Sequence, residues 1–152
     1  MVKFQDLKED AEKFAKGFCK ALNENPNYNK AGKGWKGPLL LIMKASGEIE
    51  DDISAFADLE DGKCKGIKVL GPGEEPPSEP VITVSGPMYL WKAIAFKEKD
   101  PIQCLMTGLL QVDGNMNLVM KYAKATLELA NTAEKTDTSL LTRYDLGSEE
   151  EE

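Results

Sequence analysis

The sequence predicts an α+β fold in which a five-stranded, mostly antiparallel sheet carries helices packed on one face. Apolar residues recur at helical spacing near the start of the chain and again at residues 115–131, whereas short runs with strand periodicity are grouped between them. Strands grouped between terminal helices are typical of an α+β layer fold. The chain has 152 residues, which suits one domain with its own core.

The first half of the chain begins with a helix and continues with strands. A helix is predicted up to Leu22, because the apolar residues recur every three or four positions, at Phe4, Leu7, Ala11, Phe14, Ala15, Phe18 and Leu22. Residues 25–38 are rich in Gly and Asn and predict a loop. Strands are predicted at 39–43, 53–60 and 64–70, the last two joined by a tight Asp-Gly turn.

The second half begins with a connector, residues 71–80, that is rich in proline and acidic residues. A fourth strand at 81–84 and a helix at 88–96 follow, with Pro87 suited to the first helical turn. A short helical turn is predicted at 102–106, and the fifth strand at 107–112. The domain is therefore predicted to span residues 1–131. The polar, aperiodic residues 132–152 are predicted to form an acidic, mobile tail.

The helix at 115–131 is apolar over most of its circumference. Its polar residues form one narrow stripe, at Asn117, Lys121, Lys124, Glu128 and Asn131. An ordinary surface helix is apolar over roughly a third of its circumference. One flank consists of Met116, Val119, Met120, Ala123, Leu127 and Ala130, and the other of Leu118, Tyr122, Ala125 and Leu129. Either protein or a ligand could cover the second flank, and these residues alone do not say which flank meets the sheet.

Composition excludes several classes of function. The chain contains no histidine, which rules out Ser-His-Asp and Cys-His catalysis and histidine metal ligands. The net charge of −7 argues against non-specific binding of nucleic acid. We therefore expect no enzyme, no cofactor and no metal. The N-terminus lacks a signal-peptide pattern, and no apolar run is long enough to span a membrane. These features predict a cytoplasmic protein whose three cysteines are reduced.

Residues 100–122, with the sequence DPIQCLMTGLLQVDGNMNLVMKY, carry a family pattern. This segment resembles the signature of the sterol carrier protein (non-specific lipid-transfer protein) domain. The matching residues are Asp100, Pro101, Leu105, Met106, Gly108, Val112, Gly114, Asn115, Met116, Leu118, Met120 and Lys121. The order of elements from Phe4 to Asn131 is also similar to that family. The segment is less basic than usual, with Leu109 and Gln111 where the family often has basic residues.

The resemblance implies a carrier that holds a fatty acid, fatty acyl-CoA, sterol or other lipid in a tunnel between the sheet and the helices. The residues predicted to contact such a ligand are Trp91, Ile94, Leu105, Met106, Met116, Val119, Met120, Tyr122, Ala123 and Leu127. Methionines suit this role because their flexible side chains adapt to ligand shape. Candidates for holding a carboxylate or phosphate at the tunnel mouth are Lys33, Lys36, Lys63, Lys65 and Lys68.

A second hypothesis comes from another class of protein. The apolar helix face could instead contact an enzyme partner or a second copy of the chain, making the domain a non-catalytic accessory module. For either function, stable insertion into a membrane is not expected, although transient membrane contact would suit a lipid carrier. The sequence does not determine the oligomeric state or the identity of the lipid.

Overall fold

The computed structural model describes residues 1–149 and is built around one five-stranded sheet with the strand order β3-β2-β1-β4-β5. The strands are β1 (Lys36–Lys44), β2 (Ile53–Glu60), β3 (Lys63–Leu70), β4 (Ile82–Pro87) and β5 (Gln111–Asp113). Strand β1 is parallel to β4, and the other three pairings are antiparallel. This arrangement confirms the predicted α+β fold class and the mostly antiparallel sheet.

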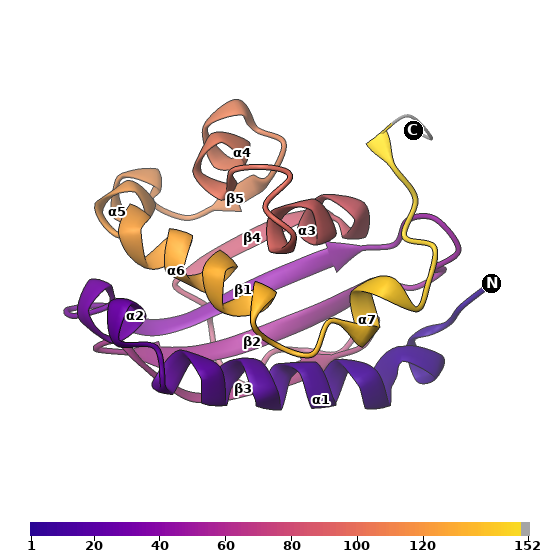
Figure 1. Cartoon of the computed structure of the whole chain (residues 1–152), viewed down its shortest axis with the longest axis horizontal. Helices are drawn as coiled ribbons and strands as arrows, with labels where there is room; N and C mark the ends of the chain where they lie inside the picture. The colour runs from indigo at the N-terminus through magenta and orange to yellow at the C-terminus, as the bar shows by residue number, and fades with distance from the viewer. Residues whose placement is uncertain (150–152) are drawn as a thin grey trace.

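Helices cover the face of the sheet that is turned toward the viewer in Figure 1, where α1 and α6 lie in front of the strands. The helices are α1 (Phe4–Asn23), α2 (Pro26–Ala31), α3 (Met88–Ala95), α4 (Pro101–Thr107), α5 (Met116–Lys121), α6 (Ala123–Glu134) and α7 (Ser139–Thr142). Helix α1 packs mainly on β3, with its apolar residues Leu7, Ala11, Ala15 and Leu22 buried. Helix α6 contacts α1, α2, α3 and α4. It therefore lies at the centre of the helical layer.

The β2–β3 hairpin turns where the sequence predicts it, at Asp61 and Gly62. Both residues have positive φ, 48° and 78°, as a two-residue hairpin turn of this kind requires. A Cβ atom at Gly62 would collide with the backbone carbonyl of Asn29 in α2. Only glycine can therefore satisfy the turn and let α2 approach the end of the hairpin.

Strand β1 starts earlier than predicted, and β4 continues to Pro87, which was predicted in the first turn of the next helix. Three further elements differ from the prediction. The predicted loop at 25–38 contains α2, which Asn25 caps by accepting hydrogen bonds from the backbone of Asn27 and Tyr28. The fifth strand starts only at Gln111, because α4 continues to Thr107 and ends at Gly108 in a left-handed conformation. The long last helix is two helices, since the backbone departs from helical geometry at Tyr122.

The predicted boundary after residue 131 falls inside α6, which continues to Glu134, and Thr132 is fully buried. Beyond α6 the chain returns to the body. The Leu146 side chain is buried, and its carbonyl accepts a hydrogen bond from the Ser46 hydroxyl. The Arg143 guanidinium forms an ion pair with Asp10 at 2.6 Å. Residues 150–152 of the predicted tail lie outside the described residues, and the mobility of the tail stays a prediction.

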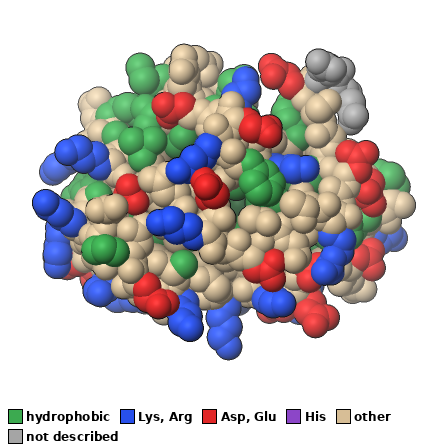
Figure 2. Space-filling model, in the orientation of Figure 1, with side chains coloured by type: hydrophobic (Ala, Val, Ile, Leu, Met, Phe, Trp, Pro, Cys, Tyr) green, Lys and Arg blue, Asp and Glu red, His purple; other side chains and the backbone are tan. Residues whose placement is uncertain are grey.

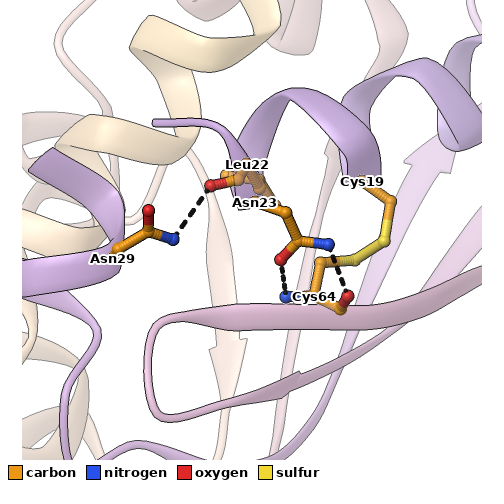
Figure 3. The surroundings of a disulfide bond; sticks show 5 residues. All are labelled: Cys19, Leu22, Asn23, Asn29 and Cys64. Atoms are coloured by element: carbon orange, nitrogen blue, oxygen red, sulfur yellow. Dashed lines mark hydrogen bonds between the residues drawn. A yellow bond between two sulfur atoms is a disulfide. The ribbon is translucent and has the colours of Figure 1, made fainter. Parts of the chain in front are cut away.

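A disulfide joins Cys19 of α1 to Cys64 of β3 (Figure 3). Beside it, the Asn23 side chain accepts a hydrogen bond from the Cys64 backbone N–H at 2.8 Å and donates one to the Cys64 carbonyl at 2.9 Å. The expectation of three reduced cysteines is therefore wrong for this pair, although Cys104 is free and buried. The two partners are 45 residues apart in sequence and meet only because α1 packs on β3.

The apolar interior is divided into two clusters. The larger core lies between the middle of the sheet and the helices and includes Leu22, Tyr28, Leu59, Ile82, Leu105 and Val119. The smaller core lies toward the chain ends and consists of Leu7, Ala11, Ile49, Ile53, Met88 and Leu146. The larger core is the one built from the elements of the family pattern, and it is where the candidate site lies.

Candidate ligand-binding cavity

A cavity of about 250 Å³ lies between the sheet and the helices. The sheet contributes alternate residues, such as Leu39, Leu41 and Met43 of β1 and Ala55, Ala57 and Leu59 of β2. Their side chains share a face because successive residues of a strand point to opposite sides. The register pairs Leu39 with Ala57 and Leu41 with Ala55, so each leucine lies beside an alanine. The small alanine side chains leave space above β2 that the leucines do not fill.

Two helices close the opposite side of the cavity. Helix α1 contributes Ala11, Phe14, Ala15, Phe18 and Leu22, and α6 contributes Ala125, Thr126, Leu129, Ala130 and Ala133. Both sets follow the three-and-four spacing of a single helical face. The α6 set is rich in alanine. The small alanine side chains do not fill the space between the helix and the sheet. The cavity-facing side of α6 is therefore mainly the second predicted flank, with Ala130 added from the first.

Both tryptophans of the chain line the cavity. Trp35 packs edge-to-face on Tyr122, with ring centroids 5.1 Å apart, so the break between α5 and α6 is held against the loop before β1. The Trp91 indole N–H donates to the carbonyls of Ile42 and Gly86, each at 3.1 Å. The Trp35 N–H donates to the Gly37 carbonyl at 2.8 Å. Neither indole N–H is therefore left for a ligand.

The described lining of the cavity carries no charged side chain and very few polar groups. Tyr28 is the most buried of these polar residues, and burial raises the pKa of its phenol to about 12. Burial also raises the pKa of the Cys104 thiol, which therefore stays protonated near neutral pH. An apolar site of this kind suits hydrocarbon and offers no counter-ion to a charge placed inside it.

The structure brings together half of the residues that the sequence predicted for the ligand site. Trp91, Ile94, Leu105, Val119 and Tyr122 line the cavity, from α3, α4 and the α5–α6 region. The family pattern contains Leu105, Val119 and Tyr122, whereas Trp91 and Ile94 lie in the helix before it.

The other predicted residues lie elsewhere. Met106 is 72% exposed at the end of α4, and Met116 and Leu127 are also exposed. Met120 and Ala123 are half-buried but do not line the cavity. Met106 belongs to α4, whereas the other four residues belong to α5 and α6. The break at Tyr122 separates these two helices, and a continuous helical pattern does not reveal it.

Sequence reasoning also missed residues that line the cavity. It assigned no ligand role to α1, α2 or the sheet, although Phe14, Phe18, Tyr28 and Leu39 line the cavity. For α1, the amphipathic pattern was visible, but it looks the same whether the apolar face meets protein or ligand. Tyr28 was missed because the helix that carries it was predicted as a loop.

The lysines proposed for a tunnel mouth do not line the cavity. Lys65 forms an ion pair with Glu60 at 3.0 Å, and Lys68 one with Glu74 at 3.7 Å. Within residues 1–149, no cluster of cysteine and acidic side chains is arranged to hold a metal ion. No helix in that range has the length and apolar character needed to cross a membrane.

Residues 18–126 match the family described as the SCP-2 sterol transfer family. The match covers more than half of the chain and contains both the sheet and most of the cavity lining. The chain therefore belongs to this family, which confirms the resemblance seen in the sequence.

Solved structures give the same result. A crystal structure of sterol carrier protein 2 is 27% identical, with a TM-score of 0.74, over 82% of this chain and 96% of that one. A conserved hypothetical protein of Thermus thermophilus is 28% identical, with a TM-score of 0.71, over 82% and 86%. The apo sterol carrier protein 2 of Yarrowia lipolytica, 18% identical over 78% and 87%, shares the fold with a TM-score of 0.51. Among curated protein sequences, none matches significantly.

Proposed function

We propose that this protein binds a long apolar ligand, such as a fatty acid, fatty acyl-CoA, sterol or other lipid, in the cavity between the sheet and the helices, as an intracellular lipid carrier. The observation that carries the proposal is the uncharged apolar cavity of about 250 Å³ in a member of a sterol transfer family. A native core is normally close-packed, with few voids larger than a water molecule. A space of this size inside the larger core therefore supports the presence of a bound ligand.

The size of the cavity sets how a ligand would bind. A dry cavity of roughly 150 Å³ is enough to hold benzene, and most ligand pockets are about 300 Å³ or more. A long chain would therefore fill the cavity. It would then either extend outward past the helices or widen the cavity slightly. Each buried methylene contributes about 0.8 kcal/mol, less the cost of ordering the ligand.

The two tryptophans allow a direct test, because both line the cavity. A long-chain lipid that carries a nitroxide on its chain should quench their fluorescence saturably at low concentration. A water-soluble nitroxide without a chain serves as the control and should quench only in proportion to its concentration. The variants Trp35→Phe and Trp91→Phe each leave one reporter, and a ligand that fills the cavity should quench both. Quenching no stronger than that of the soluble nitroxide would refute the carrier function.

The ligand class can be identified in parallel. Protein purified from its host is extracted with organic solvent under denaturing conditions, and the lipids are identified by mass spectrometry. A stoichiometric lipid that competes with the nitroxide probe would support the carrier function and identify its class. Absence of any lipid together with absence of quenching would contradict it.

We propose a binding protein and not an enzyme. Histidine is absent, and the buried Cys104 is held as a thiol by the burial that raises its pKa. No cofactor or nucleic acid is part of the proposal, and transient membrane contact would serve to load and release the lipid. Incubation with fatty acyl-CoA should therefore release no free CoA above the uncatalysed rate.

The proposed cytoplasmic location can be tested through the redox state of the Cys19–Cys64 disulfide. Structural disulfides are rare in the cytosol, where thiols are kept reduced. Thiol trapping in freshly lysed cells, followed by mass spectrometry of the peptides with Cys19 and Cys64, measures their state. Fully oxidised cysteines in the native host would count against a cytoplasmic location.

An accessory module is the second candidate, and one observation favours it. Large apolar side chains are exposed at Met106, Leu109, Met116 and Leu127. Hydrophobic side chains gather over α4 and α5 at the upper left of Figure 2. Exposed apolar surface of this kind can mark contact with an enzyme partner or a second copy.

Light scattering after size exclusion tests the contact with a second copy. A stable dimer that the Met106→Asp and Leu109→Asp variants return to monomer would favour the accessory role. A monomer that binds the nitroxide lipid saturably would favour the carrier.

A further inference from the structure

Two tyrosines line the cavity, and their hydroxyl groups are in different surroundings. The Tyr122 hydroxyl lies beside Gly34, in the exposed loop before β1. Tyr28 belongs to α2 and is 2% exposed, so its ring is enclosed by the larger core. Of these two tyrosines in the described lining, Tyr28 is therefore the one whose ring is enclosed by the protein.

Helix α2 is held firmly in place, which fixes the Tyr28 ring. Asn25 caps the helix and also donates through its side-chain amide to the Glu128 carboxylate at 3.1 Å and to the Thr132 hydroxyl at 3.0 Å. Asn29 donates to the Gly62 carbonyl at 2.6 Å. Tyr28 lies between these two anchors, so its side chain is positioned by hydrogen bonds to α6 on one side and to the β2–β3 turn on the other.

The Tyr28 hydroxyl forms no hydrogen bond to any described residue, although a buried hydroxyl without a partner is costly. Among residues 1–149, no side-chain polar atom is both sealed from water-sized space and unpartnered. The Tyr28 oxygen therefore touches space that a water or a ligand atom can occupy. We take the cavity to be that space, because Tyr28 lines it.

The other polar groups of the lining already form hydrogen bonds within the protein or point away from the cavity. Both indole N–H groups donate to backbone carbonyls. The Thr126 hydroxyl donates to the Tyr122 carbonyl at 3.2 Å. Ser54 alternates with cavity-facing Ala55 along β2, which directs its side chain to the other face of the sheet. Tyr28 is thus the hydroxyl in the described lining that remains to bind the polar end of a ligand.

We propose that the Tyr28 hydroxyl binds the polar end of the ligand and selects a neutral lipid that ends in a hydroxyl or carbonyl group over one that ends in a carboxylate. This inference rests on the proposed carrier function and specifies its ligand class. A hydroxyl can donate one hydrogen bond and accept another, which matches an alcohol or a ketone. A carboxylate would enter a lining that has no cation, and one neutral hydrogen bond does not offset its lost hydration.

Titration behaviour is consistent with this role. Because burial raises the pKa of Tyr28 to about 12, its phenol is neutral throughout the physiological range. It therefore remains a donor at every pH at which the protein would act, and it adds no negative charge that would repel a ligand.

The test compares three ligands with the same chain, namely hexadecanol, hexadecanoate and hexadecane, by displacement of diphenylhexatriene from the protein at neutral pH. In the unaltered protein we expect hexadecanol to bind at least about tenfold tighter than hexadecanoate. Tyr28→Phe keeps the ring and removes the hydroxyl. This variant should bind hexadecanol about fivefold more weakly and hexadecane with unchanged affinity. Tyr144→Phe is the matched control, because its hydroxyl contacts Asp6 and Asp10 outside the cavity.

The possible outcomes test the Tyr28 contact and the carrier function separately. Hexadecanoate binding as tightly as hexadecanol to the unaltered protein would overturn the selection of a neutral ligand without needing any variant. Equal effects of Tyr28→Phe on hexadecanol and hexadecane would overturn the role of the hydroxyl. In both cases the carrier function would stand. Failure of the unaltered protein to bind any of the three ligands would overturn the carrier function itself, and the Tyr28 contact with it.

Discussion

The larger and smaller cores contain similar side chains but are filled very differently. The cavity of about 250 Å³ is lined mainly by the larger core, with Ala11 and Ile53 of the smaller core at its border, whereas a second space of about 40 Å³ is bordered mainly by the smaller core. The smaller core is closed by segments from both chain ends, through Leu7 and Leu146, which pack on Ile49 and Ile53. The larger core is spanned by helices whose inner faces are rich in alanine. One region is thus packed for stability, and the other leaves space for a ligand.

This difference separates two roles that apolar residues play in one small domain. A side chain in close-packed surroundings gains dispersion contacts on every side, and its removal leaves a cavity. A side chain that already borders a cavity has fewer contacts to lose. Substitutions in the smaller core should therefore change stability, and substitutions around the cavity should change binding.

The largest effect is expected for Leu7→Ala, because Leu7 is 1% exposed within the smaller core. We expect a loss of about 3–5 kcal/mol in the free energy of unfolding, measured by urea denaturation. Leu129→Ala is the matched control on α6, where the leucine is half-buried and borders the cavity. It should cost less than half as much stability and weaken lipid binding. Equal losses of stability would contradict the contrast between the two cores.

Reduction of the Cys19–Cys64 disulfide should have the next largest effect. It closes a loop between residues 45 apart, so its loss should lower the free energy of unfolding by about 3–4 kcal/mol in the chain-entropy description. Urea denaturation with and without dithiothreitol measures this. A Cys19→Ala, Cys64→Ala variant should show the lower stability and no further response to the reductant. A response in that variant would assign the effect to something other than this bond.

Filling the cavity should affect binding more than stability. Ala125→Leu places extra methyl groups against the cavity, so lipid affinity should fall by about tenfold or more while the unfolding free energy changes by less than about 1 kcal/mol. Ala123→Leu makes the same change on the same helix but away from the cavity. Quenching of tryptophan fluorescence by the nitroxide lipid measures the affinity of both variants. A larger loss of lipid affinity in Ala123→Leu than in Ala125→Leu would show that the other flank of the helix meets the ligand.

The smallest effect is expected at the cap of α2, which positions Tyr28. Asn25→Ala should cost about 1–2 kcal/mol of unfolding free energy, because it removes the cap and the hydrogen bonds to α6. Thermal unfolding followed by circular dichroism measures the change. Asn27→Ala serves as the control, since Asn27 is exposed and only its backbone N–H contacts Asn25. Indistinguishable melting curves for the two variants would show that the cap does not anchor α2.

Much of the fold could be predicted because its signals are local. The alternation at 53–60 and 64–70 and the Asp-Gly turn between them identify β2 and β3 within a residue. Helix α2 also had a local signal, the Asn25-Pro26 pair of a cap followed by a first-turn proline, which the richness of the segment in Gly and Asn concealed. The break at Tyr122 had none, since the apolar pattern continues across it. Its cause is tertiary, because the Tyr122 ring packs on Trp35 from a distant loop.

The candidate site could be predicted in part for a similar reason. The family pattern lies in residues 100–122, so it pointed to α4 and α5, and the sheet, α1 and α2 were not assigned to the lining. Met106 and Leu127 fit the apolar pattern as well as Leu105 and Ala125 do, yet the first two are exposed and the second two are buried. Hydrophobicity identifies residues that prefer to leave water, but it does not identify what they meet.

By itself, the sequence determined the α+β class, most of the order of the elements in residues 4–131, the resemblance to the sterol carrier family and the absence of histidine chemistry. The class and most elements follow from local periodicity and turn residues, the resemblance from the pattern in residues 100–122, and the last point from composition. Only the tertiary structure decided that Cys19 meets Cys64, that the residues after α6 return to the smaller core, and that Tyr28 lines the cavity while its hydroxyl has no hydrogen-bond partner among residues 1–149. Each of these depends on which distant surfaces meet, because packing brings together groups that the order of residues along the chain leaves unrelated.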